Sequence, residues 1–313
     1  MSDLFHIAFY KFVHLEQPAM VADRVREITK GALGSILIAH EGINGMLAGS
    51  AAQLDDLEAA LQADASSDAV LAGLFKGMLF KRTACLTQPF KRMKVHWKKE
   101  IVPLGVDGVD APGRIDEIHA NDVPPQAWRE LIKRPDVVLL DNRNSFEWRL
   151  GRFEGAVDPG VINFRDFPEY VKAHAQQWKD QGKTVAMYCT GGIRCEKSSV
   201  WMQDMGLKVA QLEGGILNYF KEMPDAEKDW QGECFVFDSR VALDTKLHET
   251  PTTVADVYST QDLKDAAHAE DARWRLNRAN RLDGNAKSVG EGGDEGVGEG
   301  ASDRGNEQAE PAQ

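Results

Sequence analysis

The sequence has few cysteines and no long apolar run, and both shortages restrict what the protein can be. Four cysteines in 313 residues are too few for a disulfide-held scaffold, so a reduced, cytoplasmic protein is expected. No apolar stretch approaches the roughly 18 residues that a membrane-spanning helix needs, and the N-terminus lacks the pattern of a secretory signal. The cysteines form no CxxC pair and the eight histidines form no HExxH pattern, so no metal site is predicted.

Negative charge predominates, but it is unevenly distributed. The formal net charge is −12, yet the stretch from Lys76 to Lys99 contains eight Lys or Arg residues and no acid. Because salt screens charges more than about 8–10 Å apart, local charge decides what a surface attracts. This stretch also contains Phe80, Phe90 and Trp97, which suits phosphate contact and base stacking. The alternative is an ordinary solvated basic face. The candidate RNA-contacting residues are Lys81, Arg82, Lys91, Arg92, Lys94, Lys98 and Lys99.

The first hundred residues predict a small α+β domain. Strand-like segments at 6–13, 34–49 and 77–87 alternate with helical segments at 18–32 and 51–64. The resulting order, β-α-β-β-α-β, is typical of a ferredoxin-like sandwich. Residues 101–117, "IVPLGVDGVDAPGRIDE", are expected to be a linker.

The pattern changes to alternating helices and strands in residues 118–230, which predicts a doubly wound parallel sheet. Residues 231–250 are expected to form a strand segment that packs on the body of the protein. Residues 251–313 are expected to be partly helical and then disordered, because residues 284–313 contain eight glycines and no Leu, Ile or aromatic residue. This tail has a net charge of −5 and is expected to repel RNA or to compete for the basic face.

The loop in "MYCTGGIRCEKSS" follows a buried strand, at the edge of the sheet where such folds place active sites. Its glycines allow the backbone N–H groups to point inward and form an anion cradle, which the next helix and one arginine reinforce. This arrangement favours a thiolate at Cys189. The alternative is an inert buried cysteine. The residues of the predicted cradle are Thr190, Gly191, Gly192, Ile193 and Arg194.

The other cysteines have less distinctive surroundings. Cys195 lies at the start of the helix that follows the loop, where either an inert core thiol or a second reactive thiol is compatible with the sequence. Cys85 and Cys234 lie in apolar, strand-like segments and are predicted to be core residues.

Four residues separate Cys189 from Arg194, one fewer than in cysteine phosphatases, and this shorter loop resembles that of rhodanese-like domains. Residues 124–224 resemble such a domain in other parts too. The matching residues are Asp141, Arg143, Glu147, Gly151, Gly155, Ala156, Gly214 and Gly215. We expect Arg143 and Glu147 to form a buried structural ion pair near the loop rather than to act in catalysis.

A wider resemblance covers residues 5–245. The segments "AHEGINGMLAGS", "FKRMKVHWKKEIVPLG", "MYCTGGIRCEKSS" and "GECFVFDSRV" together resemble the bacterial tRNA uridine(34) hydroxylase family. The resemblance implies oxygen-dependent conversion of the wobble uridine to 5-hydroxyuridine, tRNA as the partner, and Cys189 as the active-site cysteine with a proposed persulfide intermediate. Molecular oxygen would be the co-substrate, and no other cofactor is evident. Some longer relatives have a cysteine-rich C-terminal segment, but this chain has no cysteine after Cys234.

Alternative functions use the same loop. A thiosulfate or persulfide sulfurtransferase needs the loop but no RNA surface, and a non-catalytic rhodanese-like module would bind a protein partner. The net negative charge and the absence of apolar runs favour neither DNA nor a membrane as a partner. The segment "EGINGM", residues 41–46, is compatible either with a tight hairpin or with a substrate contact.

Overall fold

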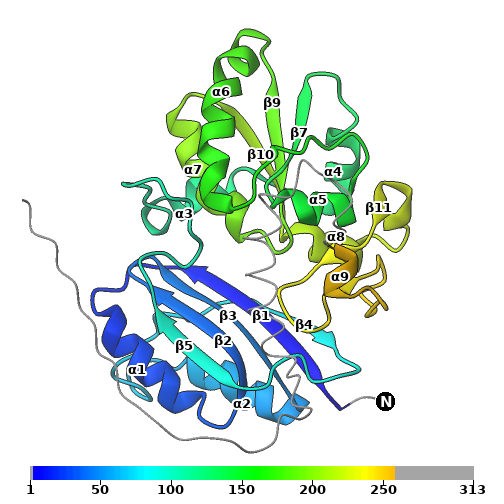
Figure 1. Ribbon diagram of the computed structural model, residues 1–313. Helices are drawn as coiled ribbons and strands as arrows, with labels where there is room; N and C mark the ends of the chain where they lie inside the picture. The colour runs from blue at the N-terminus through cyan, green and yellow to red at the C-terminus, as the bar shows by residue number, and fades with distance from the viewer. Residues whose placement is uncertain (1–2, 258–313) are drawn as a thin grey trace, which may run out of the picture. The chain divides into compact units, whose positions relative to one another are not determined.

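The computed structural model describes residues 3–257 (Figure 1). The predicted acidic tail, residues 284–313, lies outside the described residues, as does most of the predicted helical part before it. None of the helices within residues 3–257 is long and apolar enough to cross a bilayer.

The N-terminal domain is a five-stranded sheet with two helices packed on it. The strand order is β4-β1-β3-β2-β5, and all neighbouring strands are antiparallel except β2 and β5, which are parallel. Its elements are β1 (Phe5–Phe12), α1 (Pro18–Ile28), β2 (Leu33–Ala39), β3 (Gly42–Gly49), α2 (Ala51–Leu61), β4 (Phe80–Ala84) and β5 (Met93–Trp97). The predicted ferredoxin-like order is therefore confirmed for the first four strands.

The fifth strand, β5, differs from the sequence-based expectation, which included no strand after residue 87 of this domain. Its apolar residues Met93, Val95 and Trp97 alternate with Lys94 and His96, which is a strand pattern. The high density of basic residues led us to interpret this stretch as a charged surface. The two helices follow ordinary rules: Pro18 lies in the first turn of α1, and the Ser50 hydroxyl accepts a hydrogen bond from Gln53 N at 3.3 Å at the start of α2.

The segment between the two sheets is packed rather than exposed. It contains a short 3₁₀ turn (Pro112–Arg114) and α3 (Ile115–His119). Ile101, Val102 and Leu104 are buried in a core cluster that also includes Phe12 of β1 and residues of the second sheet. The predicted linker therefore joins the two domains through apolar contacts.

The second domain is a four-stranded sheet in the order β6-β10-β9-β7, in which all pairs are parallel. Along β9, Val185 and Met187 belong to one core cluster and Ala186 and Tyr188 to another, so both faces of the sheet are covered. This explains the continuous apolar runs in the sequence. The elements are β6 (Asp122–Val123), α4 (Pro125–Leu131), β7 (Val137–Asp141), α5 (Ser145–Leu150), β8 (Gly151–Phe153), α6 (Phe167–Asp180), β9 (Thr184–Tyr188), α7 (Ile193–Asp204), β10 (Lys208–Leu212) and α8 (Gly215–Glu222).

The segment after residue 229 differs from the single returning strand that we predicted. It forms β11 (Trp230–Gly232), which pairs with β8, and then a separate hairpin of β12 (Cys234–Phe235) and β13 (Ala242–Leu243). The chain reverses between β12 and β13, where Val241 has a positive φ of 62°. The last described helix is α9 (Val254–Val257).

Candidate active site

The loop predicted to carry the chemistry runs from the end of β9 at Tyr188 to the start of α7 at Ile193. The backbone N–H of Gly192 donates a hydrogen bond to Cys189 Sγ at 3.1 Å. Gly192 has a φ of +103°, and a Cβ at this position would lie 2.7 Å from the Tyr10 hydroxyl. Only glycine therefore fits here, for both conformational and steric reasons.

The sulfur of Cys189 lies in surroundings that favour its ionised form. Burial alone would raise the pKa of this thiol, because Cys189 is 1% exposed. The Cys195 thiol, the Arg194 charge and the backbone amides of Cys195 and Arg194 outweigh burial and hold the pKa well below its usual value. The backbone amides of Gly192, Arg194 and Cys195 therefore bond the sulfur, which is enclosed in this structure.

Cys195 is the partner thiol of Cys189. Burial and the hydrogen bond to Cys189 raise the pKa of Cys195 well above its usual value, so this residue stays protonated and donates to the neighbouring sulfur. Asn142 Nδ2 lies 3.8 Å from Cys195 Sγ and donates to Ser198 Oγ at 2.8 Å. Burial also raises the pKa of Cys85 to about 11 and that of Cys234 to about 12.

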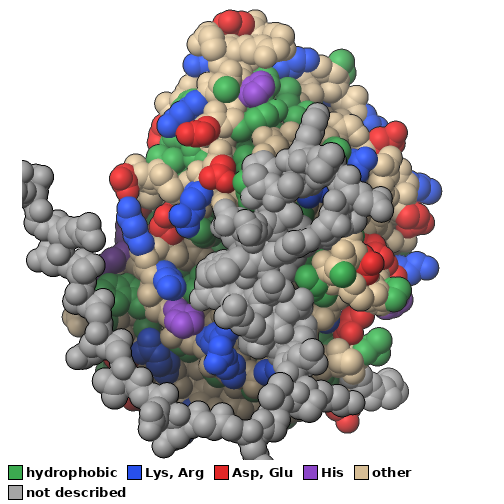
Figure 2. All heavy atoms as spheres, in the orientation of Figure 1, with side chains coloured by type: hydrophobic (Ala, Val, Ile, Leu, Met, Phe, Trp, Pro, Cys, Tyr) green, Lys and Arg blue, Asp and Glu red, His purple; other side chains and the backbone are tan. Residues whose placement is uncertain are grey.

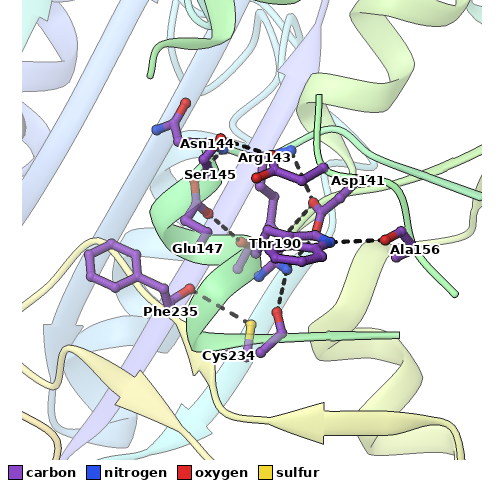
Figure 3. A network of polar contacts seen from close by, with 12 residues as sticks. Asp141, Arg143, Asn144, Ser145, Glu147, Ala156, Thr190, Cys234 and Phe235 are labelled. Carbon is purple, nitrogen blue, oxygen red and sulfur yellow. Dashed lines mark hydrogen bonds and ion pairs between the residues drawn. The ribbon is translucent and has the colours of Figure 1, made fainter. Parts of the chain in front are cut away.

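Arg194 is fixed by a buried carboxylate. Its two terminal nitrogens donate to Glu147 Oε2 and Oε1, each at 2.8 Å. Glu147 Oε2 also accepts from Asn144 N at 3.1 Å, and the Thr190 hydroxyl lies 3.4 Å from Glu147 Oε1 (Figure 3). Such a bidentate pair determines both the position and the direction of the guanidinium group.

The expected ion pair between Arg143 and Glu147 is wrong. Arg143 pairs with Asp141 through two hydrogen bonds, of 2.8 Å and 2.6 Å, and also donates to Gly151 O at 2.6 Å (Figure 3). The sequence offered Glu147 two arginines as partners. Asp141, only two residues away in the chain, forms the ion pair with Arg143. Glu147 pairs with Arg194 instead.

The first residues of helix α8 bind carbonyl groups of the loop. Ile216 N donates to Cys189 O at 3.0 Å, and Leu217 N donates to Thr190 O at 3.2 Å. A Cβ at Gly215 would lie 2.6 Å from Cys189 O, so this close approach also requires glycine. Because the loop carbonyls are bound on this side, the loop amides are free to face the sulfur.

The N-terminal domain contributes residues directly to the loop. Lys81 Nζ donates to Gly191 O and, at 2.8 Å, to Gly214 O, and it lies 5.5 Å from the centre of the Tyr10 ring. The Tyr10 hydroxyl donates to Glu196 Oε1 at 2.5 Å. Burial raises the pKa of Glu196 and lowers that of Lys81. Lys81 therefore stabilises the loop, which differs from the RNA contact that we expected for it.

A second contact between the domains involves the segment "EGINGM". Lys197 of α7 is buried, and its Nζ donates to Glu41 at 2.8 Å, to Glu100 at 2.6 Å and to Val102 O at 2.9 Å. Glu41 lies in the tight turn between β2 and β3. The segment is thus a hairpin whose acidic tip binds the helix that follows the candidate catalytic loop.

Comparison with known proteins agrees with this architecture. Residues 5–101 match the UPF0176 acylphosphatase-like domain family, and residues 124–222 match the rhodanese-like domain family. Proteins named tRNA uridine(34) hydroxylase from Anaplasma marginale (strain St. Maries) and Legionella pneumophila (strain Corby) are each 40% identical to this chain. The alignments span 77% and 79% of this chain and 83% and 93% of those relatives. A relative of the same name from Acinetobacter baumannii (strain AYE) is 40% identical over 77% of this chain and 73% of its own length.

The chain belongs to the tRNA uridine(34) hydroxylase family.

The other candidate RNA-contacting residues differ from one another in ion pairing and in exposure. Arg82 pairs with Asp55 and Glu58 at 2.7 Å and 2.6 Å, and Lys99 pairs with Asp107 at 2.8 Å. Lys94 is half-buried. Lys91, Arg92 and Lys98 are exposed, and within residues 3–257 their side chains have no ion-pair partner. Figure 2 shows Lys and Arg side chains on the face where Figure 1 places the N-terminal sheet.

The aromatic residues in this basic stretch also differ in burial. Phe90 is buried against His6, and Phe80 packs on Phe9, whereas Trp97 is 53% exposed. Only Trp97 of the three is therefore available for base stacking. No group of three or more His, Cys, Asp or Glu side chains in the described part of the chain is arranged to hold a metal ion.

Several residues at the site were not identified from the sequence as parts of it. Tyr10 lies 186 residues from Glu196, and Lys197 lies 156 residues from Glu41, so no local pattern relates them. Glu147 was identified in the rhodanese pattern but given the wrong arginine.

Proposed function

We propose that this protein converts the wobble uridine of tRNA, position 34, to 5-hydroxyuridine, with Cys189 as the reactive sulfur. The observation that supports this most strongly is the combination of a thiolate-stabilising loop with membership of the tRNA uridine(34) hydroxylase family. The proposed substrate places the enzyme in the cytoplasm.

In the proposed mechanism, the Cys189 thiolate adds to carbon 6 of the uracil ring. The S–C6 bond forms, and the electron pair of the C5–C6 double bond moves onto carbon 5 and the O4 carbonyl. Carbon 5 then bonds one oxygen atom of molecular oxygen. The second oxygen atom leaves as water after uptake of two protons and two electrons. Two molecules of a small-molecule thiol supply them as they are joined in a disulfide. Loss of the C5 proton and departure of the thiolate restore the double bond. In the alternative route, a persulfide on Cys189 is the sulfur species that is oxidised.

The proposed substrate suits the enclosed position of the sulfur. Uridine 34 lies in a single-stranded loop, so its base can be turned out of the stack at low cost. A Cβ at Gly191 would meet nothing within 4 Å, so the loop has free space on this side. Because Cys189 is 1% exposed, the residues that cover its sulfur must move before a base can reach it.

Nucleoside analysis of total tRNA tests the function. A strain without the gene should lack 5-hydroxyuridine and its derivatives at position 34, and the wild-type gene should restore them. The Cys189→Ser variant should not restore them. Normal 5-hydroxyuridine in the deleted strain would remove this activity from the protein.

The alternative function is a thiosulfate or persulfide sulfurtransferase, which the anion-binding loop also favours. Thiocyanate release from thiosulfate and cyanide, measured beside tRNA binding by the same preparation, separates the two functions. Thiocyanate release with no tRNA binding would favour the transferase. A module that only binds a partner needs no ionised cysteine, and the depressed pKa of Cys189 counts against it.

A further inference from the structure

An exposed phenylalanine lies beside the candidate catalytic loop. Phe237 is 51% exposed, whereas its neighbours Phe235 and Val236 are buried. It lies between β12 and β13, in the segment "GECFVFDSRV" that the family resemblance includes and the proposed mechanism does not use. An exposed aromatic ring near a reactive group requires an explanation, since the ring would be better stabilised in the core.

The turn that contains Phe237 is firmly held. Val236 N donates to Val241 O at 2.9 Å, and buried Arg240 donates to both carboxylate oxygens of Asp238 at 2.8 Å and 2.7 Å. Arg240 also donates to Thr83 Oγ1 at 3.1 Å, and His6 Nε2 lies 3.5 Å from Asp238. The exposed ring is therefore mounted on a rigid turn that is fixed to the N-terminal domain.

The ring is also close to the catalytic loop. The guanidinium carbon of Arg194 lies 5.8 Å from the centre of the Phe237 ring. Phe235 packs edge-on against Phe237 at 5.0 Å and against Phe146 at 4.9 Å, which fixes the ring from behind. Arg194 is one of the residues that stabilise the Cys189 thiolate, so the exposed ring lies against a side chain that acts directly on the reacting sulfur.

Exposed positive charge lies on the neighbouring segment. Ser239 N, two residues after Phe237, donates to Pro89 O at 3.5 Å. Pro89 precedes Lys91 and Arg92, which are exposed and have no ion-pair partner among the described residues. An aromatic platform beside free basic groups is the arrangement that single-stranded nucleic acids bind.

We propose that Phe237 is the platform on which a base of the tRNA anticodon loop stacks, while Lys91 and Arg92 contact the neighbouring phosphates. This inference rests on the proposed function and specifies how the substrate is held. Stacking on Phe237 leaves the opposite face of the base free. It supplies binding and orientation, whereas Cys189 supplies the chemistry.

The test compares variants at position 237 in the full-length enzyme. Phe237→Ala and Phe237→Leu should raise the KM for tRNA about 10-fold, while Phe237→Tyr and Phe237→Trp should stay close to wild type, because stacking requires an aromatic face. Met20→Ala, at another exposed apolar residue on helix α1, is the matched control and should change nothing. The ultraviolet absorbance of the Cys189 thiolate should be the same in all variants.

Binding measurements keep this test separate from the proposed function. Fluorescence anisotropy with a labelled anticodon stem-loop RNA should show weaker binding for Phe237→Ala. For the double variant Lys91→Gln/Arg92→Gln it should show a smaller salt dependence. Equal KM and equal RNA affinity for Phe237→Ala and wild type would overturn the inference. So would full retention of binding by Phe237→Leu. If wild-type enzyme makes no 5-hydroxyuridine but binds RNA through Phe237, the proposed function fails and this inference stands.

Discussion

Cys189 and Cys195 are equally buried, but their pKa values are shifted in opposite directions. Each residue is 1% exposed, yet the pKa of Cys189 is held well below its usual value and that of Cys195 is raised well above it. Burial opposes ionisation at both positions. The difference arises because Cys189 lies where the loop amides and the Arg194 charge converge, whereas Cys195 lies within the helix and serves as a donor.

This comparison shows that exposure alone does not decide whether a buried cysteine thiol ionises. The direction of the surrounding hydrogen-bond donors decides which sulfur carries the charge. Cys234 supports the same conclusion. It is fully buried, no comparable set of donors faces it among residues 3–257, and burial raises its pKa to about 12.

The largest expected effect is on activity. Cys189→Ser should reduce 5-hydroxyuridine in complemented cells to the level of the deletion strain, because a serine hydroxyl stays protonated at neutral pH. Cys195→Ser should keep most of the activity, since its hydroxyl can still donate to the Cys189 sulfur. Nucleoside mass spectrometry measures both. Full activity of Cys189→Ser would remove the thiol from the mechanism, and equal loss in both variants would contradict the contrast between the two cysteines.

The second prediction separates charge from stability at Arg194. Arg194→Met should raise the pKa of Cys189, and it should destabilise the fold by about 3–5 kcal/mol because Glu147 is left buried and unpaired. The double variant Arg194→Met/Glu147→Gln should regain most of that stability but keep the raised pKa. Urea unfolding gives the stability, and thiolate absorbance gives the pKa. If the double variant also regained the low pKa, Arg194 would not be a source of the thiolate's stabilisation.

The third prediction concerns the contribution of the N-terminal domain. Lys81→Met should lower kcat by about 10-fold, because the carbonyls of Gly191 and Gly214 lose their partner and the loop shifts. The matched control is Arg82→Met, at the next residue of the same strand, whose guanidinium pairs with carboxylates of α2. It should stay near wild type. If both variants instead raised KM equally without changing kcat, Lys81 would belong to an RNA-binding face.

The smallest expected effect is that of Cys195→Ala, which removes a donor without adding charge. The pKa of Cys189 should rise, but the amides and Arg194 should keep it below that of an ordinary thiol. The pH dependence of thiolate absorbance measures this, with Cys195→Ser as the control. No change in Cys195→Ala would mean that the Cys195 thiol is not a donor to Cys189.

Local features of the site could be predicted from the sequence because they depend on contiguous residues. The strand "TVAMY", the glycines of the loop and the arginine that follows them are close in the chain and imply an inward set of amides. The ferredoxin-like order of the first domain was similarly evident from alternating patterns.

Contacts between distant parts of the chain could not be predicted. No sequence pattern distinguishes Lys81 from the other basic residues of its segment, because its role depends on the position of β4 against two loop carbonyls. Glu147 pairs with Arg194 because Arg143 is already paired with Asp141. Which carboxylate binds which arginine depends on distances in the folded structure. The strand β5 was not predicted because the basic residues in and around it indicate a charged surface rather than a strand.

The most direct test of the account is a pH titration of thiolate absorbance in wild type minus Cys189→Ser. The absorbance that depends on Cys189 should already be present at neutral pH and should persist well below about 8.5, the usual pKa of a cysteine thiol. As the pH falls it should disappear only at the depressed pKa of this group. A titration with its midpoint at or above the ordinary thiol value would contradict the account.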